Sequence, residues 1–353
     1  MNRLKNLRQK MQTEGIDAYF SVVPENRRYL SGFTGSAGSL LILPEQAFLL
    51  TDFRYTEQAA RETTGFIIIK TANNMFAALA ELSSGVKRLG FEGDYLNFRD
   101  YCRLQETLPQ TGLVSLPDLI NDLRAVKDPE EISLIRTAVE ITDKAWTNIL
   151  NQLQIGRTEE EIALDLEFIM RRAGASGVSF DFIVASGSRS ALPHGRASNK
   201  KIQKDEFLTV DFGAVYQGYC SDMTRTVILG EPDKRQKKIY ELVLAANYAG
   251  IEAIKPGLKG KEVDAVAREI INKAGYGEYF GHGLGHAVGL NVHEGPNLNM
   301  REEKTLEPGM VLTVEPGIYI PDWGGVRIED MVLVTAQGCE VLTRSPKVLT
   351  VIC

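Results

Sequence analysis

The strongest constraint on the fold is a repeat in the second half of the chain. Residues 156–174 align without gaps onto residues 257–275, and a glycine, a glutamate, an apolar residue and a terminal Ala-Gly recur in step. A segment with the pattern of a long helix precedes each copy, at 129–153 and at about 233–254. A pair of short apolar runs joined by a turn follows each copy. Helical periodicity alone explains part of the likeness, but the matching order of helix, helix and hairpin favours an internal duplication with a pseudo-twofold axis.

The first of the two hairpins carries a pair of carboxylates. Residues 209–222 contain two apolar runs around a Tyr-Gln-Gly turn, and Asp211 and Asp222 lie eleven residues apart. With a two-residue loop, this odd separation places both side chains on one face of the sheet. Like charges facing each other are destabilising, and a bound cation removes the conflict. If this pair were isolated, the simpler interpretation would be that one aspartate faces solvent and the other caps a nearby backbone group. The pair is not isolated, because further carboxylates follow in the sequence.

The second hairpin repeats the arrangement with glutamates. Glu315 lies in the run 309–320 and Glu329 in the run 325–334, on either side of a Pro-Asp-Trp-Gly-Gly turn. Their even separation of fourteen residues places both on one face if the loop holds an odd number of residues. Two hairpins with inward carboxylate pairs can hold two divalent ions. The duplication predicts this metal site at the seam between the halves, where pockets tend to form.

Histidines are confined to the same half of the chain. The four are His194, His282, His286 and His293, and the last three lie in the glycine-rich run 281–294. A single histidine is more often structural than catalytic, but four in segments that flank the carboxylate hairpins favour a functional role. The glycines allow close backbone approach, and their spacing is not that of a dinucleotide-binding fingerprint.

The first part of the chain is expected to form an α/β domain with a mixed sheet. We predict helices at 1–14, 54–63 and 75–82, and strands at 18–23, 39–43, 47–50, 66–69 and 89–91. The glycine-rich run 31–38 lacks the Lys-Ser/Thr ending of a phosphate-binding loop and is interpreted as a turn. Asp128, Pro129 and Glu131 form the signature of a helix start. We therefore divide the chain into residues 1–125 and residues 126–353.

Charge and cysteine usage exclude several classes of protein. A formal net charge of -6 argues against nucleic acid or an anionic membrane as the main partner. The four cysteines form no CxxC pair and no dense framework, which fits a reducing compartment. The first twelve residues lack the apolar run of a signal peptide, and no stretch approaches membrane-spanning length. We expect a cytoplasmic protein with no nucleic-acid or membrane partner.

The motifs around these residues resemble a known family. VDFGxxxxGYCSDMTRT, HGLGHxxGLxVHE, LxVEPGIY and VRIED all stand in residues 128–353, and they are similar to those of the pita-bread metallopeptidases, which include methionine aminopeptidase, aminopeptidase P and prolidase. Residues 29–36 and 51–55 are similar to the creatinase/prolidase N-terminal domain, which methionine aminopeptidases usually lack. The resemblance is therefore closest to the proline-specific branch. It implies an α/β creatinase/prolidase-type N-terminal domain and an α+β pita-bread catalytic domain built of duplicated helix-helix-hairpin units.

The resemblance also implies a dinuclear metal site. The ligands it implies are Asp211, Asp222, His286, Glu315 and Glu329. Four carboxylates and one imidazole suit two divalent ions, with Mn²⁺ first and Co²⁺ or Zn²⁺ as alternatives. In the family a ligand histidine precedes a second catalytic histidine by seven residues, so His286 and His293 are preferred over His282, which is interpreted as structural. Cys220 falls on the face of Asp222 and is interpreted as a packed neutral thiol.

The implied reaction is hydrolysis of the bond before proline by a hydroxide that the two ions activate. Glu315 is the implied proton shuttle, and His293 and His194 the groups that hydrogen-bond the substrate and the oxyanion. Arg327 could pair with a substrate carboxylate or with a metal ligand, and the sequence does not choose between these. We expect a homodimer by resemblance.

Four functions are compatible with this fold. The favoured one is an Xaa-Pro dipeptidase acting on proline-containing peptides, and the main alternative is an Xaa-Pro aminopeptidase that acts on longer peptides. A creatinase-like C–N hydrolase shares the fold but does not keep the metal ligands. A catalytically inactive peptide-binding module would lose ligands and gain charged tails, and neither change is present in this sequence.

Overall fold

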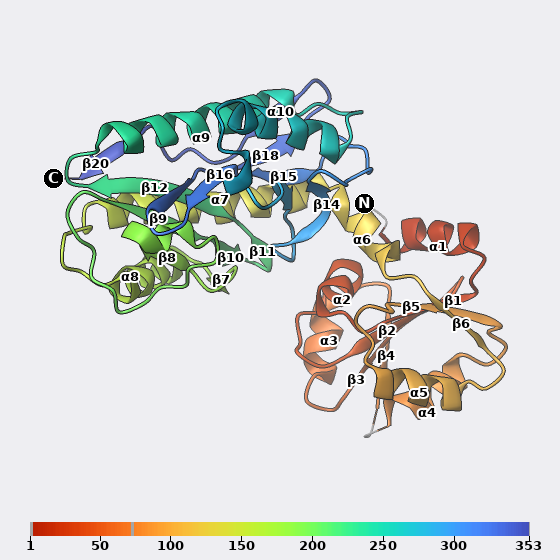
Figure 1. The fold of residues 1–353 in the computed structure, drawn as a ribbon. Coiled ribbons are helices and arrows are strands. Elements are labelled where there is room, and N and C mark those ends of the chain that lie inside the picture. The colour runs from red at the N-terminus through yellow and green to blue at the C-terminus, as the bar shows by residue number, and fades with distance from the viewer. Residues whose placement is uncertain (1–2, 72–73, 353) are drawn as a thin grey trace. The chain divides into compact units, whose positions relative to one another are not determined.

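Figure 1 shows the computed structural model of the protein, which describes residues 3–71 and 74–352. The chain divides into two compact units, Met1–Arg124 and Ala125–Cys353. None of the helices in the described ranges combines the length and the apolar character that crossing a bilayer requires.

In the first unit, a six-stranded mixed sheet runs in the order β4-β3-β2-β1-β5-β6. Its strands are β1 (Ala18–Ser21), β2 (Ser39–Ile42), β3 (Ala47–Thr51), β4 (Ile67–Lys70), β5 (Arg88–Phe91) and β6 (Gly112–Ser115). The pairs β1–β2 and β2–β3 are antiparallel and the other three pairs are parallel. This arrangement confirms the predicted α/β class and its mixed sheet.

Helices pack on this sheet through apolar faces. They are α1 (Arg3–Thr13), α2 (Pro24–Ser31), α3 (Thr56–Glu62), α4 (Met75–Leu82), α5 (Phe98–Thr107) and α6 (Asp118–Ala125). Leu79 of α4 and Leu104 of α5 are fully buried in the core cluster that includes the strand residues Phe20 and Leu41. The sequence analysis located α1, α3 and α4 but not α2, α5, α6 or β6. Residues 1–2 of the first predicted helix lie outside the described residues.

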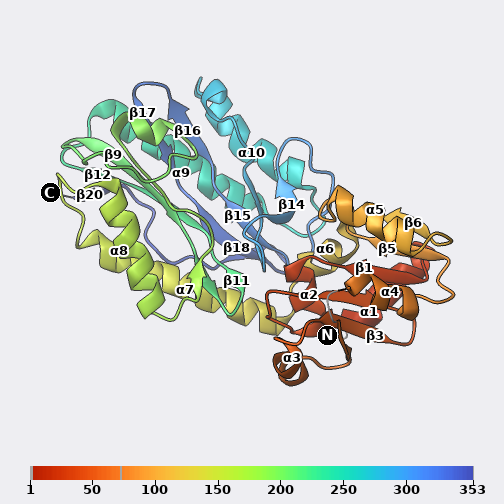
Figure 2. The same ribbon diagram turned by 90° about the horizontal axis from the view of Figure 1, so that it is seen from below.

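The second unit contains two similar helix pairs. They are α7 (Pro129–Leu150) with α8 (Glu159–Arg172), and α9 (Lys234–Ala253) with α10 (Gly260–Lys273). Figures 1 and 2 both show the strands of this unit lying between the two pairs. Each pair contributes to its own apolar core. The order of helix, helix and hairpin in both halves confirms the predicted duplication.

Strands of the second unit fall into several small sheets. The sheet orders are β20-β12-β9-β8, β11-β10-β7, β14-β13-β15-β18-β19 and β16-β17. The strands are β7 (Gly177–Val178), β8 (Ile183–Ser186), β9 (Glu206–Phe212), β10 (Ala214–Tyr216), β11 (Tyr219–Cys220), β12 (Met223–Leu229), β13 (Gly285–Ala287), β14 (Glu294–Leu298), β15 (Val311–Val314), β16 (Gly317–Ile320), β17 (Gly324–Arg327), β18 (Asp330–Val334), β19 (Cys339–Val341) and β20 (Thr350–Ile352). Short 3-10 turns lie at η1 (Gly187–Ala191) and η2 (Gly277–Tyr279).

The helix start predicted at the head of the second unit is present. The Asp128 side chain accepts hydrogen bonds from the backbone N–H groups of Glu130 and Glu131, and the Glu131 carboxylate accepts one from the backbone N–H of Asp128. This reciprocal pair satisfies N–H groups that have no partner within the helix. It fixes where α7 begins.

The register of the first hairpin confirms the predicted orientation of its aspartates. Tyr216 pairs with Tyr219, so the loop is Gln217-Gly218, and both residues have the positive φ that a two-residue hairpin turn of this kind requires (42° and 79°). Asp211 pairs with Thr224. Asp222 is two residues from Thr224 and therefore shares its face, so both carboxylates point the same way.

The second hairpin differs from the continuous ladder that the sequence suggested. The pairing β15–β18 ends at Val314 with Asp330, and the pairing β16–β17 begins at Gly317 with Arg327. The two glutamates occupy the gap between these ladders. Pro316 follows Glu315 and has no N–H to donate to a neighbouring strand, which explains the interruption. The register on both sides still places Glu315 opposite Glu329, because the loop 321–323 holds an odd number of residues as predicted.

Candidate active site

The residues singled out in the sequence line one cavity in the second unit. Its volume is about 580 Å³. The predicted site residues on its wall are Asp211, Asp222, His194, His282, His286, His293, Glu315, Arg327 and Glu329. They come from the two hairpins, from β13 and from the loops after η1, η2 and β13. Folding therefore brings together groups that are up to 135 positions apart in the chain.

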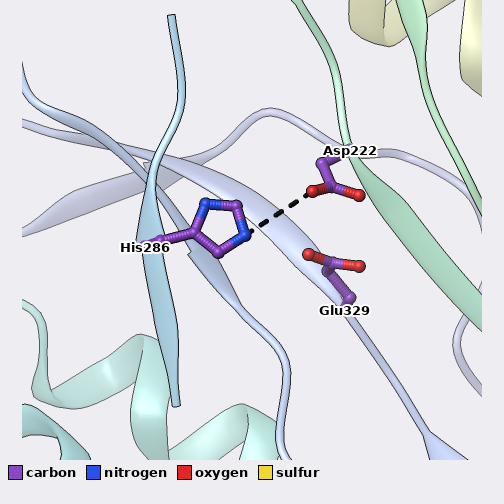
Figure 3. A group of neighbouring side chains, drawn as sticks. All are labelled: Asp222, His286 and Glu329. Carbon is purple, nitrogen blue, oxygen red and sulfur yellow. Dashed lines mark ion pairs between the residues drawn. The ribbon is translucent and has the colours of Figure 1, made fainter. Parts of the chain in front are cut away.

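A histidine and two carboxylates form the centre of this cavity. Asp222, His286 and Glu329 each offer a ligand atom, and these atoms lie within 4.8 Å of one another. Figure 3 shows the three side chains directed toward one point. The His286 Nε2 atom lies 3.6 Å from Asp222 Oδ2 and 3.5 Å from Glu315 Oε1. This is a spacing at which one cation can contact several of these atoms at once.

The protonation of His286 follows from its surroundings. Its Nδ1 atom lies 3.1 Å from the carbonyl oxygen of Ala287, which can only accept, so Nδ1 carries the hydrogen. Burial lowers the pKa of His286 to about 4, so the ring is neutral near pH 7. Nε2 then presents a lone pair to the carboxylate oxygens of Asp222 and Glu315. A lone pair facing two anionic groups is repulsive unless a cation lies between them.

Burial of the carboxylates raises the same conflict. Asp222 is 5% exposed and Glu329 1% exposed. Loss of solvation, followed by the charge of neighbouring carboxylates, raises the pKa of both residues well above the usual range. Within the described ranges, no hydrogen-bond partner reaches the buried Oδ1 atoms of Asp211 and Asp222. Buried oxygens without partners are costly, and hard divalent cations prefer such ligands, so this donor set fits metal ions.

The pKa of Glu315 is raised, like those of Asp222 and Glu329. Burial raises the pKa of Glu315 to about 8, although the positive charge of Arg327 opposes the shift. Its carboxylate also lies 3.4 Å from the Thr313 hydroxyl. In the absence of a metal, this group exchanges its proton near neutral pH.

Arg327 pairs with a carboxylate of the site. Its Nη2 atom donates to Asp211 Oδ2 at 2.7 Å, its Nη1 to the Tyr319 hydroxyl at 2.8 Å and its Nε to Thr224 Oγ1 at 3.0 Å. The guanidinium is 3% exposed. Of the two pairings considered from the sequence, the structure has the one with a metal-ligand candidate. Pairing with a substrate carboxylate stays a prediction.

Thr224 connects this guanidinium to a further carboxylate. The Thr224 hydroxyl accepts from Arg327 Nε, which can only donate, so its own hydrogen points to Glu329 Oε2 at 2.7 Å. The sequence analysis did not single out Thr224. Its position opposite Asp211 in the hairpin could have indicated that it lies at the site, because a residue opposite a proposed ligand points to the same face of the sheet.

Histidines lie around the carboxylate cluster in different roles. The His293 ring lies 4.4 Å from the His286 ring, measured between centroids, and burial lowers the pKa of His293. His194 is exposed on the cavity wall. His282 lies 2.7 Å from the Gly283 carbonyl oxygen through Nδ1 and 2.8 Å from the Tyr319 hydroxyl through Nε2. These contacts occupy both of its nitrogens away from the carboxylates, in line with the structural role predicted for it.

Cys220 is buried beside a backbone carbonyl group. It is 4% exposed, and its sulfur lies 3.8 Å from the carbonyl oxygen of Leu290. The metal-ligand group formed by Asp222, His286 and Glu329 does not include it. This agrees with its interpretation as a buried thiol.

Comparison with protein families identifies the chain. The sequence model of metallopeptidase family M24 matches residues 133–336, and that of the creatinase/prolidase N-terminal domain matches residues 3–126. The chain belongs to metallopeptidase family M24. It is therefore a metal-dependent peptidase with the pita-bread fold.

Individual relatives of this M24 peptidase match it over nearly their whole length. It is 46% identical to the solved Xaa-Pro dipeptidase from Bacillus anthracis, with a TM-score of 0.97 and 99% of each chain covered. It is 40% identical to the Xaa-Pro dipeptidase of Pyrococcus furiosus, over 98% of this chain and 99% of the relative. It is also 40% identical to the solved X-Pro aminopeptidase from Thermotoga maritima MSB8, with a TM-score of 0.90, 98% of this chain and 100% of that chain covered.

Proposed function

We propose that this M24 peptidase is an Xaa-Pro dipeptidase that hydrolyses the bond between an N-terminal residue and proline. The observation that carries the hydrolytic assignment is the cluster of carboxylates around the neutral His286 ring, in which buried oxygens without hydrogen-bond partners suit metal ions. The proline specificity rests on the relatives named Xaa-Pro dipeptidase, which match over the full chain at 40% and 46% identity. The unit from about residue 126 would carry the catalytic site.

Two divalent ions would be held by residues from both hairpins. The proposed ligands are Asp211, Asp222, His286, Glu315 and Glu329, with Mn²⁺ as the first choice and Co²⁺ or Zn²⁺ as alternatives. When bound, such ions polarise the scissile carbonyl and lower the pKa of water to near neutral. The orphaned Oδ1 atoms of Asp211 and Asp222 would gain their missing partners in this way.

Side chains of the cavity would handle the protons and orient the peptide. Glu315, which lines the cavity 3.5 Å from His286 Nε2, would carry a proton to the leaving nitrogen. His293 and His194 line the same cavity and would donate hydrogen bonds to the substrate and to the oxyanion. Arg327 would keep the Asp211 carboxylate in place through its bond of 2.7 Å.

Apolar side chains of the cavity lining would suit proline. They include Phe180, Ile183 and Pro193. Proline has no amide hydrogen and presents a rigid ring, so it requires apolar contact at that position and no acceptor for an N–H group. Such a wall accommodates the ring without leaving a polar group unpaired.

A second candidate is an Xaa-Pro aminopeptidase acting on longer peptides. The observation in its favour is the full-length similarity to the X-Pro aminopeptidase from Thermotoga maritima. The two functions differ in whether the cavity accepts residues beyond proline. An inactive peptide-binding module is disfavoured, because all five proposed ligand residues line the cavity.

One assay separates these functions. The metal-stripped protein is reloaded with Mn²⁺ and given an Xaa-Pro dipeptide and an Xaa-Pro-Yaa tripeptide with the same first residue, with Glu315→Gln as the matched inactive control. Cleavage of the dipeptide alone supports the dipeptidase, and cleavage of the tripeptide before proline supports the aminopeptidase. If the loaded protein cleaves neither peptide, the proposed catalytic function is wrong.

We further propose a cytoplasmic homodimer. The proposal rests on the resemblance to proline-specific peptidases and on the cysteine pattern, which fits a reducing compartment. Sedimentation analysis of the purified full chain measures the oligomeric state, and a monomer at micromolar concentration would contradict it.

A further inference from the structure

The backbone on which the two glutamates stand is held in an unusual way. Glu315 and Glu329 lie in the gap between two strand ladders, where regular sheet hydrogen bonds do not fix the direction of a side chain. The N–H of Glu315 donates instead to the Leu284 carbonyl oxygen at 2.7 Å, and the N–H of Glu329 to the Thr224 carbonyl oxygen at 3.1 Å. The nitrogen side of each peptide plane is thus held by a different neighbouring strand or loop.

A single side chain holds the oxygen side of both peptide planes. Asn247, from the middle of α9, is fully buried. Its Nδ2 donates to the carbonyl oxygens of Val314 at 2.9 Å and Ile328 at 3.2 Å, the residues that directly precede the glutamates. An amide nitrogen has two hydrogens, and both are used here. Asn247 therefore ties together the two backbone segments in the place where the ladder is missing.

The orientation of the Asn247 amide depends on a half-buried lysine, Lys347. Lys347 Nζ donates to Asn247 Oδ1 at 2.8 Å and to Asp330 Oδ2 at 2.6 Å. Because an ammonium group only donates, it fixes which end of the amide is oxygen and directs the NH₂ toward the two carbonyls. Without Lys347, the amide would lose the contact that prevents it from rotating.

The same ion-pair cluster reaches the Glu329 backbone from its other side. Arg225 pairs with Asp330 Oδ1 at 2.8 Å and also donates through Nη1 to the carbonyl oxygen of Glu329. Asp330 therefore has two cationic partners, Arg225 and Lys347. Loss of one still leaves the buried carboxylate paired with the other.

We propose that Asn247 and Lys347 are positioning residues for the metal centre, which hold Glu315 and Glu329 at the spacing that two divalent ions require. This inference rests on the proposed function, because it takes the two glutamates as metal ligands. Neither residue lines the cavity, so their effect passes through the backbone alone. Outer partners that orient metal ligands typically contribute 10- to 100-fold to metal affinity.

Two variants test the proposal on the full chain. Asn247→Asp keeps the shape of the side chain but removes both donors, and Lys347→Met keeps its length but removes the charge. Lys347→Arg, which retains a cation, is the matched rescue variant. Val243→Ala, a cavity in the buried face of α9 outside the network, controls for general destabilisation. Affinity for Co²⁺ is measured by competition with a chelating indicator, together with the visible absorption of bound Co²⁺.

We expect Asn247→Asp and Lys347→Met to bind the weaker of the two Co²⁺ ions 10- to 100-fold less tightly and to alter the Co²⁺ absorption. Lys347→Arg should recover most of the affinity, and Val243→Ala should lower the melting temperature while leaving the affinity within threefold of wild type. If Asn247→Asp does not fold, the Lys347→Met variant alone tests the proposal. Lys347→Met should still fold, because Asp330 keeps Arg225 as a partner.

The possible failures are distinguishable. A wild-type protein that binds two Co²⁺ ions and cleaves Xaa-Pro peptides, with Lys347→Met indistinguishable from it in affinity and absorption, overturns the positioning role alone. A wild-type protein that binds no divalent ion overturns the proposed function and this inference together.

Discussion

Replacing Glu315 with glutamine in the metal-free protein should make it more stable at pH 8 while leaving it about equally stable at pH 5. The reason is the buried position of the carboxyl, whose pKa rises to about 8 in the folded chain against an ordinary value of 4.5. A raised carboxyl pKa means that the folded state binds the proton more tightly. Its stabilising contribution is full below pH 4.5 and is lost as the pH rises toward 8.

The histidines set the window in which this effect is measured. Burial lowers the pKa of His282 and His286 to about 4 from an ordinary 6.5. Their contribution to stability is therefore present above pH 6.5 and lost as the pH falls toward 4, opposite in sign to that of Glu315. Between pH 6.5 and pH 8 these two rings stay neutral in the folded state and lose their remaining protons in the unfolded state, which partly offsets the loss from Glu315. Over that window the raised pKa of Glu315 should by itself remove about 2 kcal/mol from the free energy of unfolding, and the raised pKa values of Asp222 and Glu329 act in the same direction.

The assay is thermal unfolding of the metal-free protein in excess chelator at pH 5, 6.5 and 8. Wild type should lose about 5 °C in the melting temperature of the second unit between pH 6.5 and pH 8. Glu315→Gln, which cannot ionise, should lose less. Glu315→Asp, which keeps the charge, is the control. The reasoning is refuted if wild type and Glu315→Gln respond identically to pH across this window.

Four further predictions follow from the contacts of the second unit. Thr224→Val, which removes the hydroxyl between Glu329 and Arg327, should lower Mn²⁺ affinity in a calorimetric titration about tenfold, whereas Thr224→Ser should stay near wild type. Arg327→Lys breaks the geometry that holds Asp211 and should lower kcat/KM on an Xaa-Pro dipeptide about 10- to 100-fold; an unchanged value would contradict the positioning of Asp211. Chelation should abolish activity and lower the melting temperature by about 5–10 °C, and added Mn²⁺ should restore both. Asp128→Ala, at the α7 cap, should cost about 1 kcal/mol in urea unfolding with kcat unchanged.

Much of the site was predictable because it depends on local rules. The side-chain period of two in strands, together with the Gln217-Gly218 turn, is enough to place Asp211 and Asp222 on one face. The same period and an odd loop place Glu315 opposite Glu329. These relations hold within a few residues of chain and need no knowledge of the packing.

Other parts of the structure depend on packing between distant segments and were not predictable. In the sequence, Asn247 is one polar residue in a long helix, and only the packing of α9 against the gap between the ladders shows that it is fully buried and bonded to two strands. The partner of Arg327 also stayed open, because the choice between Asp211 and a substrate carboxylate depends on contacts across 116 residues. In the first unit, β6 was missed because its four residues, Gly112–Ser115, are half-exposed or exposed and lack strong alternation.

The duplicated second unit divides its proposed metal ligands between its halves. Asp211 and Asp222 lie on or beside strands of one apolar core, whereas His286, Glu315 and Glu329 lie on or beside strands of the other. Each copy thus supplies part of the proposed binding site, and neither copy supplies all of it. Bound ions would act as cross-links between two cores that otherwise meet through their strands, so that loosening either copy opens the entire centre. The catalytic activity of such a molecule would depend on how well its two halves stay together as much as on the chemistry of any single ligand.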